Sequence, residues 1–153
     1  MFGPDEIRIA PEEPGTESVR ALLAERDAYF DLLYAEEDRN ARGVDLESGR
    51  LRFFTVRSSG QLLGCAAVLF RDGYAELKRF YLRPAFRGRG LGRRLLSTLE
   101  RDATDNGYTT LRLETGVLQP EAIGLYRSAG FYEIDSFGEY HPDPLSIFME
   151  KRL

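Results

Sequence analysis

The sequence predicts one α/β domain, in which a mixed central sheet of about six to seven strands is flanked by helices. The chain has 153 residues, of which 42% are hydrophobic, enough to build one core of ordinary size. Strand-like and helix-like segments follow one another in the order β-α-β-β-β-α-β-α-β-β. We see no internal repeat and no linker, so residues 1–153 are expected to form a single domain.

The first half of the chain is expected to form a strand, a helix and a hairpin. Residues 6–10 alternate between polar and apolar side chains, which is typical of a strand. Thr16 can cap a helix that runs to about residue 35, because apolar residues recur there at roughly helical spacing. Residues 36–49 are polar and poorly periodic, and indicate a loop or a broken second helix. Two strands, 51–57 and 61–70, are joined by a Ser-Ser-Gly turn.

The second half adds the remaining strands and two helices. Residues 74–84 follow an Asp-Gly turn and form the third strand of a meander, which ends at Pro84. In residues 90–106 leucine or alanine recurs every four positions, and an Asn-Gly pair follows, so we expect an amphipathic helix. The remaining segments are a strand at 108–115, a short helix at 120–130, and strands at 131–137 and 145–153.

Composition excludes several classes of protein. No apolar run approaches 18 residues, so we expect no membrane span, and the N-terminus lacks the pattern of a secretory signal. Cys65 is the single cysteine, which excludes an internal disulfide and suits a cytoplasmic location. Because the chain has one cysteine and one histidine, His141, a zinc site built from protein ligands is not expected. The aromatic residues of the first helix, Tyr29, Phe30 and Tyr34, are most simply helix core.

Charge is distributed unevenly along the chain. The net charge of −4 argues against binding to nucleic acid, which usually requires a broad basic face. Residues 78–101 nevertheless carry eight Lys or Arg and one acid, whereas residues 1–48 carry thirteen acids and five bases. A basic block of this size in an acidic chain indicates one discrete anionic ligand.

Residues 87–92, Arg-Gly-Arg-Gly-Leu-Gly, lie between a predicted strand and a predicted helix. Glycines allow the backbone to approach a ligand closely, and the first N–H groups of a helix have no partner within it. Those N–H groups and the helix dipole favour an anion, and Arg87, Arg89 and Arg93 add guanidinium donors. The pattern predicts a pyrophosphate site.

Two common phosphate loops do not match this segment. The glycines have the spacing G-x-G-x-G, whereas the dinucleotide-binding fingerprint is G-x-G-x-x-G. The Gly-Lys-Ser/Thr that ends a P-loop is also absent. A nucleotide-phosphate binder of either kind is therefore disfavoured.

The segment Arg87–Gly92 resembles the acetyl-CoA signature Q/R-x-x-G-x-G/A of the GNAT N-acetyltransferase superfamily. Leu125–Phe131, with the sequence LYRSAGF, resembles the late helix-to-strand segment of the same family. The order of strands and helices is similar to that of the family over nearly the whole chain. The resemblance implies the GNAT acyl-CoA N-acyltransferase fold.

The resemblance also implies a place for each part of acetyl-CoA, the expected co-substrate. Backbone amides of residues 88–93 would bind the pyrophosphate, and the strand Phe80–Arg83 would run beside the pantetheine arm. This strand would splay from the strand at 108–115, and a backbone N–H near Tyr81 or Leu82 would polarise the thioester carbonyl. The expected coenzyme-binding residues are Phe80, Tyr81, Leu82, Arg87, Gly88, Arg89, Gly90, Leu91, Gly92, Arg93 and Tyr126.

For catalysis, the resemblance implies two side chains. Tyr126 matches a tyrosine that can protonate the departing thiolate, although an aromatic residue on a helix can also simply pack on the sheet. Glu76 matches a glutamate that acts as general base, often through water, and its alternative role is that of a surface charge on a strand. Glu114 is a second candidate for the base, because strand alternation does not settle which face it uses. No metal is expected to take part.

The function expected from these features is transfer of an acetyl group to the primary amine of a small molecule by direct attack. A protein or peptide N-acetyltransferase and a non-catalytic acyl-CoA sensor are the alternatives, and a homodimer is possible because relatives are often dimers. Residues 30–50 and 136–145 are expected to contact the acceptor. Among them, Glu36, Glu37 and Asp38 could attract a cationic amine, or could form a solvated face.

Overall fold

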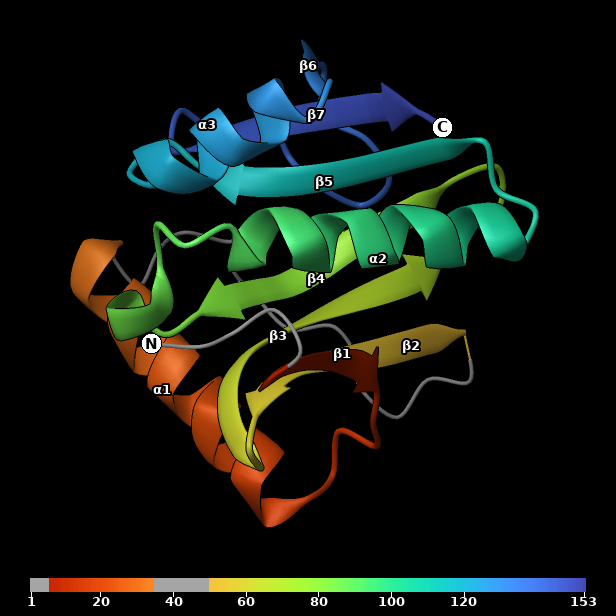
Figure 1. Cartoon of the computed structure of the whole chain (residues 1–153). Coiled ribbons are helices and arrows are strands. Elements are labelled where there is room, and N and C mark those ends of the chain that lie inside the picture. The colour runs from red at the N-terminus through yellow and green to blue at the C-terminus, as the bar shows by residue number, and fades with distance from the viewer. Residues whose placement is uncertain (1–5, 35–49) are drawn as a thin grey trace.

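The computed structural model describes residues 6–34 and 50–153. These residues form a seven-stranded mixed sheet with the order β1-β2-β3-β4-β5-β7-β6 (Figure 1). Neighbouring strands are antiparallel, except that β4 and β5 are parallel. The predicted fold class is therefore confirmed. The loop or broken helix expected at 36–49 lies outside the described residues.

The strands occupy the segments that the sequence predicts, with small differences at their ends. Their bounds are β1 Ile7–Pro11, β2 Leu51–Ser58, β3 Gln61–Phe70, β4 Ala75–Leu82, β5 Thr110–Gly116, β6 Tyr132–Ile134 and β7 Ser146–Arg152. The clearest difference is β6, which has three residues where seven were expected. The chain leaves the sheet after Ile134 and buries Phe137 against the rings of Tyr74, Tyr140 and Phe148.

Three α-helices and one short 3₁₀ helix connect the strands. Their bounds are α1 Glu17–Leu33, η3 Pro84–Phe86, α2 Leu91–Asp105 and α3 Pro120–Ser128. The Thr16 side chain accepts a hydrogen bond from the Val19 backbone N–H at 3.4 Å, which confirms the predicted cap of α1. Within the described ranges, no helix combines the length and the apolarity that a membrane crossing requires.

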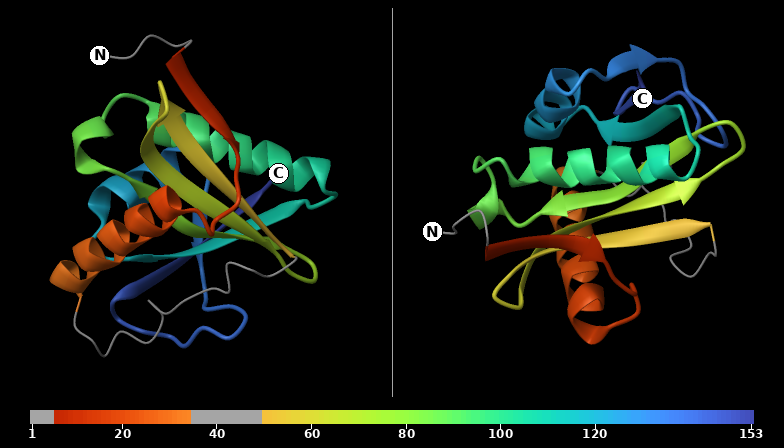
Figure 2. Two further views of the ribbon diagram at one scale, coloured as in Figure 1. Left: turned by 90° about the horizontal axis from the view of Figure 1, so that it is seen from below. Right: turned by 45° about the vertical axis from the view of Figure 1, so that its right-hand side comes forward.

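The helices cover both faces of the sheet. On one face, the leucines of α2 pack with Tyr126 of α3 and with apolar residues from β2 to β5 and β7. On the other face, α1 contributes Val19 and Leu22 to a smaller cluster that includes Cys65 and Tyr81. Figures 1 and 2 show this arrangement, with the sheet between α1 and α2. The apolar periodicity of α2 is thus satisfied by burial against the sheet.

The parallel strands β4 and β5 separate along their length. They pair only where Ala75–Leu77 lies beside Leu111–Leu113. Further along β4, the register with β3 shifts between Cys65 and Ala67, so that Arg79 and Phe80 are accommodated opposite Ala66. This bulge bends β4 away from β5. Figure 1 shows the ends of the two arrows apart, near the start of α2. The splay predicted from the resemblance is present.

Candidate functional site

The loop before α2 has the geometry of an anion site. Gly88 and Gly90 have φ angles of 75° and 81°, a region that favours glycine. A Cβ atom placed on either residue would meet no atom within 4 Å, so the space above the loop is open. Gly90 is the N-cap residue of α2, and it provides no side-chain hydrogen bond to the first turn. The N–H groups of that turn are therefore available to a ligand.

Two arginines, Arg87 in this loop and Arg93 in the first turn of α2, make contacts within the protein. The Arg87 Nε atom donates to the Leu82 carbonyl oxygen at 2.9 Å, and its guanidinium lies 5.0 Å from the centre of the Tyr29 ring. The Arg93 Nη1 atom donates to Ser128 Oγ at 3.0 Å. These contacts fix the loop against β4, α1 and α3, and leave positive charge beside it.

A cavity of about 430 Å³ lies against the loop. We call it the loop cavity. It is bounded by β4, α1 and α3 in addition to the loop. Eight of the residues predicted to bind the coenzyme line it: Phe80, Tyr81, Leu82, Arg87, Gly88, Gly90, Gly92 and Arg93. Three do not, because Arg89 is exposed, Leu91 is buried in the core and Tyr126 belongs to the neighbouring cavity.

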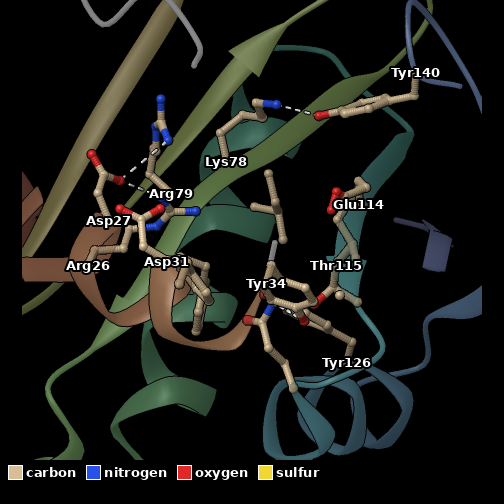
Figure 3. Close-up of a pocket in the computed structure, with 16 residues that line it drawn as sticks. Arg26, Asp27, Asp31, Tyr34, Lys78, Arg79, Glu114, Thr115, Tyr126 and Tyr140 are labelled. Carbon is tan, nitrogen blue, oxygen red and sulfur yellow. Dashed lines mark hydrogen bonds and ion pairs between the residues drawn. The ribbon is translucent and has the colours of Figure 1, made fainter. Parts of the chain in front are cut away.

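A second cavity of about 490 Å³ occupies the space where β4 and β5 separate (Figure 3). We call it the split cavity. Its walls come from α1, β4, β5 and α3, with Gln119 at the N-cap of α3 and Tyr140 from the loop before β7. Phe30, Phe80 and Gln119 line both cavities, so the two adjoin at these residues. A long ligand could run from the loop into the split.

Tyr126 lies in the wall of the split cavity and is 5% exposed. Its ring packs edge-to-face against Phe80 and Phe131, each at 5.7 Å between ring centres. Burial raises the pKa of its hydroxyl, so the phenol stays protonated across the ordinary pH range. The residue is therefore both a packing element and a potential proton donor.

The two candidate bases have different surroundings. Glu114 lies in the wall of the split cavity, and Figure 3 shows it beside Thr115 on β5. Glu76 is 1% exposed and is not among the lining residues. It accepts a hydrogen bond from the Tyr140 hydroxyl and pairs with Lys78 Nζ at 3.5 Å. Tyr140 and Lys78 do line the cavity, so Glu76 lies behind them.

The backbone of β4 supplies a further donor. The Arg83 N–H donates to Leu63 O on β3 at 3.0 Å. Because successive N–H groups of a strand point to opposite sides, the Leu82 N–H points away from β3, toward the gap beside β5. The Tyr81 N–H points to β3 by the same rule. Of the two amides that the resemblance suggested, the geometry favours that of Leu82.

The wall that α1 contributes was predicted only in part, because the range expected to contact the acceptor, 30–50, leaves out Arg26 and Asp27. Arg26, Asp27 and Asp31 line the split cavity together with Phe30 and Tyr34. The two aromatic residues, interpreted above as helix core, are only partly buried and face the cavity instead. Positions 26, 30 and 34 are spaced four apart, so they share one face of the helix. The spacing indicates from the sequence that these side chains share a face, but it does not show that this face borders a cavity.

Cys65 and His141 have no place in either cavity. The Cys65 side chain is fully buried, and burial raises the pKa of its thiol to about 12. Such a thiol is not a nucleophile at neutral pH. His141 is an exposed residue of the loop before β7. Among the described residues, no cluster of three or more His, Cys, Asp or Glu could hold a metal ion.

Comparison with known proteins agrees with this geometry. A model of the acetyltransferase (GNAT) family matches residues 16–131. The chain is 42% identical to an IAA acetyltransferase of Azospirillum brasilense, over 96% of this chain and 98% of that protein. A structure from Klebsiella pneumoniae, assigned to the acyl-CoA N-acyltransferases, superimposes with a TM-score of 0.83 at 36% identity, covering 96% and 97% of the two chains.

A more distant structure shares the fold. It is an N-acetyltransferase of Thermoplasma acidophilum in complex with coenzyme A. Its TM-score is 0.77 at 20% identity, and the alignment covers 96% of this chain and 99% of that one.

Proposed function

The chain belongs to the acetyltransferase (GNAT) family, and from this premise we propose that it moves the acetyl group of acetyl-CoA to the primary amine of a small molecule. The observation that carries the proposal is the pair of adjoining cavities at the separation of β4 and β5. One is bounded by a glycine loop suited to a pyrophosphate. The other contains a carboxylate, Glu114, and a protonated phenol, Tyr126.

In the proposed complex, the coenzyme occupies the loop cavity. Its pyrophosphate accepts hydrogen bonds from the first N–H groups of α2. The pantetheine arm lies along Phe80–Leu82 of β4, in the place of a neighbouring strand. The thioester then enters the split cavity at Phe80, which lines both cavities. We propose that the Leu82 N–H, which points toward the gap beside β5, donates to the thioester carbonyl where the two cavities adjoin.

The proposed reaction is direct transfer. The neutral amine attacks the carbonyl carbon, so that the C–N bond forms and the C–S bond breaks. The proton lost by the nitrogen goes to Glu114, directly or through water, and Tyr126 donates a proton to the departing thiolate. The products are an N-acetylated amine and CoA with a free thiol. No metal is needed at any step.

We assign the base to Glu114 rather than to Glu76, because only Glu114 borders the cavity. Glu76 remains the alternative predicted from the sequence. It would act through Tyr140, whose hydroxyl donates to it. Burial and the negative charge of Glu76 raise the pKa of the Tyr140 hydroxyl, so Tyr140 stays a phenol and could act only by passing its proton on to Glu76.

The experiment is release of CoA thiol from acetyl-CoA in the presence of a panel of amines, with products identified by mass spectrometry. The panel contains small amines and peptides with free N-termini. It also contains IAA, because the relative from Azospirillum brasilense is named an IAA acetyltransferase. Acetylation of small amines is the expected result. Acetylation of peptides alone would instead support the protein N-acetyltransferase. Coenzyme binding with no release above the buffer rate would support the sensor.

A further inference from the structure

Two arginines that line the split cavity each have one buried donor with no hydrogen-bond acceptor. Arg26 of α1 and Arg79 of β4 have side chains that are 16% and 15% exposed. The Nε atom of each is buried and has no hydrogen-bond partner within residues 6–34 and 50–153. A buried donor without an acceptor is costly. A protein can tolerate this cost in its free state when a bound ligand supplies the missing acceptor.

The carboxylates that α1 places near these arginines are exposed to solvent. Asp27 is the carboxylate that pairs with both, at 3.1 Å from Arg26 Nη1 and 4.0 Å from Arg79 Nη1. Its side chain is 60% exposed, so solvent weakens both pairs. Burial, together with the charge of Arg79, lowers the pKa of Arg26. Asp31 also borders the cavity but is exposed, and in the described part of the chain it pairs with neither arginine.

The backbone at Arg79 supports a functional role. Arg79 has a φ of 56°, a region that is strained for any residue other than glycine. It lies in the bulge of β4, where the additional residue allows Lys78 and Arg79 to line the same cavity in succession. Regular alternation would send one of them to the opposite face. The strain therefore keeps a second cation in the cavity.

The arginines lie across the cavity from the proposed chemistry. Figure 3 shows Arg26 and Arg79 on one side, and Glu114 and Tyr126 on the other. An acceptor whose amine is beside Glu114 would direct its remaining groups toward the guanidinium groups. A carboxylate, a common substituent of small amines, is a group that a guanidinium binds through paired, charge-assisted hydrogen bonds.

We propose that the acceptor is an amino acid or another small amine with a carboxylate, and that Arg26 and Arg79 bind this carboxylate in the split cavity. This inference rests on the proposed function and names the class of its acceptor. The carboxylate would supply acceptors for the buried Nε donors. It would also fix the orientation of the amine toward Glu114.

The test compares matched compounds, namely amino acids, their carboxamides and the corresponding decarboxylated amines. Binding to the CoA-loaded protein is measured by calorimetry, and acetyl transfer is measured in parallel. We expect the carboxylates to bind roughly 10- to 100-fold more tightly than their carboxamides, as charged hydrogen bonds do. Equal or weaker binding of the carboxylates would overturn the inference. The calorimetric arm remains informative without turnover, so the proposed function and the inference can fail separately.

Variants then test the two side chains. Arg26→Gln and Arg79→Gln should raise KM for the carboxylates by a similar factor and leave KM for the decarboxylated amines nearly unchanged. The matched control is Arg94→Gln, which replaces an exposed arginine of α2 outside both cavities. A preference for carboxylates that survives both substitutions would show that other residues bind the group. Circular dichroism and thermal unfolding monitor the fold of each variant.

Discussion

At the residue scale, Tyr126 combines two roles that substitution can separate. The ring holds Phe80 and Phe131 in place, whereas the hydroxyl alone can donate a proton. Phenylalanine keeps the ring contacts and removes the donor. We expect Tyr126→Phe to leave the unfolding temperature nearly unchanged and to lower kcat roughly 100-fold or more, with a much smaller change in KM for acetyl-CoA.

Steady-state kinetics on an established acceptor measures this effect. The control is Tyr132→Phe, which removes a hydroxyl that donates to Glu150 Oε1 outside both cavities. If Tyr126→Phe turned over at the wild-type rate, the hydroxyl would have no role in catalysis and Tyr126 would serve in packing alone.

The choice between Glu114 and Glu76 is also a residue-scale question. We expect Glu114→Gln to lower kcat/KM roughly 100-fold near neutral pH. The loss should shrink as the pH rises, because the acceptor amine then becomes neutral without a protein base. Glu76→Gln should mainly lower stability, since it removes the buried carboxylate that pairs with the partly buried Lys78. A pH–rate profile of both variants decides the question. If Glu76→Gln alone showed the pH-dependent loss, Glu76 would be the base.

Sequence and structure agree best where a residue's role depends on its immediate neighbours. The glycine loop was predicted because its conformation is local: Gly88 and Gly90 provide the positive φ angles and lead into α2. Arg26 and Arg79 could not be predicted in the same way. Arg79 faces the cavity through a bulge, and a bulge depends on the pairing of β4 with β3. Arg26 borders the cavity only because the second half of α1 forms one wall of it.

At the scale of elements, an ion pair attaches the edge strand β1 to β2. Arg57 Nε donates to Glu12 Oε2 at 2.7 Å, and Arg57 Nη2 donates to Glu12 Oε1 at 2.9 Å. The Thr55 hydroxyl donates to the same carboxylate. The Arg57 guanidinium holds the pKa of the Glu12 carboxyl below its usual value of 4.5. These contacts stabilise the ionised form of Glu12 in the folded state.

The stability that Glu12 contributes is therefore present above pH 4.5 and is lost as the pH falls through the lowered pKa of the folded state. We expect Glu12→Gln to lower the free energy of unfolding by about 0.5–1 kcal/mol at pH 7, since the partners are partly exposed. The difference should narrow at pH 3. Urea unfolding at both pH values measures it, with Glu13→Gln as the control because Glu13 is exposed. A difference that is the same at both pH values would contradict the argument.

Helices were easier to bound from the sequence than irregular strands. The predicted helix at 90–106 forms as Leu91–Asp105. Its apolar periodicity and the glycines that bound it lie within one continuous segment, so they can be recognised from the sequence alone. The strand expected at 131–137 shortens to Tyr132–Ile134, because Phe137 is buried among aromatic residues brought from Tyr74, Tyr140 and Phe148. Such a contact depends on the finished fold and leaves no periodic signal.

At the scale of the whole molecule, function follows from the separation of two strands. Parallel β4 and β5 begin as neighbours and then diverge, and α2 begins beside the opening (Figure 1). The order of elements predicted the sheet, and the family resemblance predicted the splay. The two adjoining cavities required the structure, since α1, α3 and Tyr140 close them from distant parts of the sequence.

The measurement that tests this account most directly is calorimetric titration with acetyl-CoA of the wild type, Gly90→Val and Gly73→Val. Both glycines have positive φ angles, 81° and 87°, and both have room for a side chain, so the two substitutions impose similar backbone strain. Only Gly90 borders the loop cavity. We predict that Gly73→Val binds acetyl-CoA as the wild type does and that Gly90→Val binds it roughly ten-fold or more weakly, a loss of about 1.4 kcal/mol. Equal affinity of all three proteins would contradict the placement of the coenzyme on this loop.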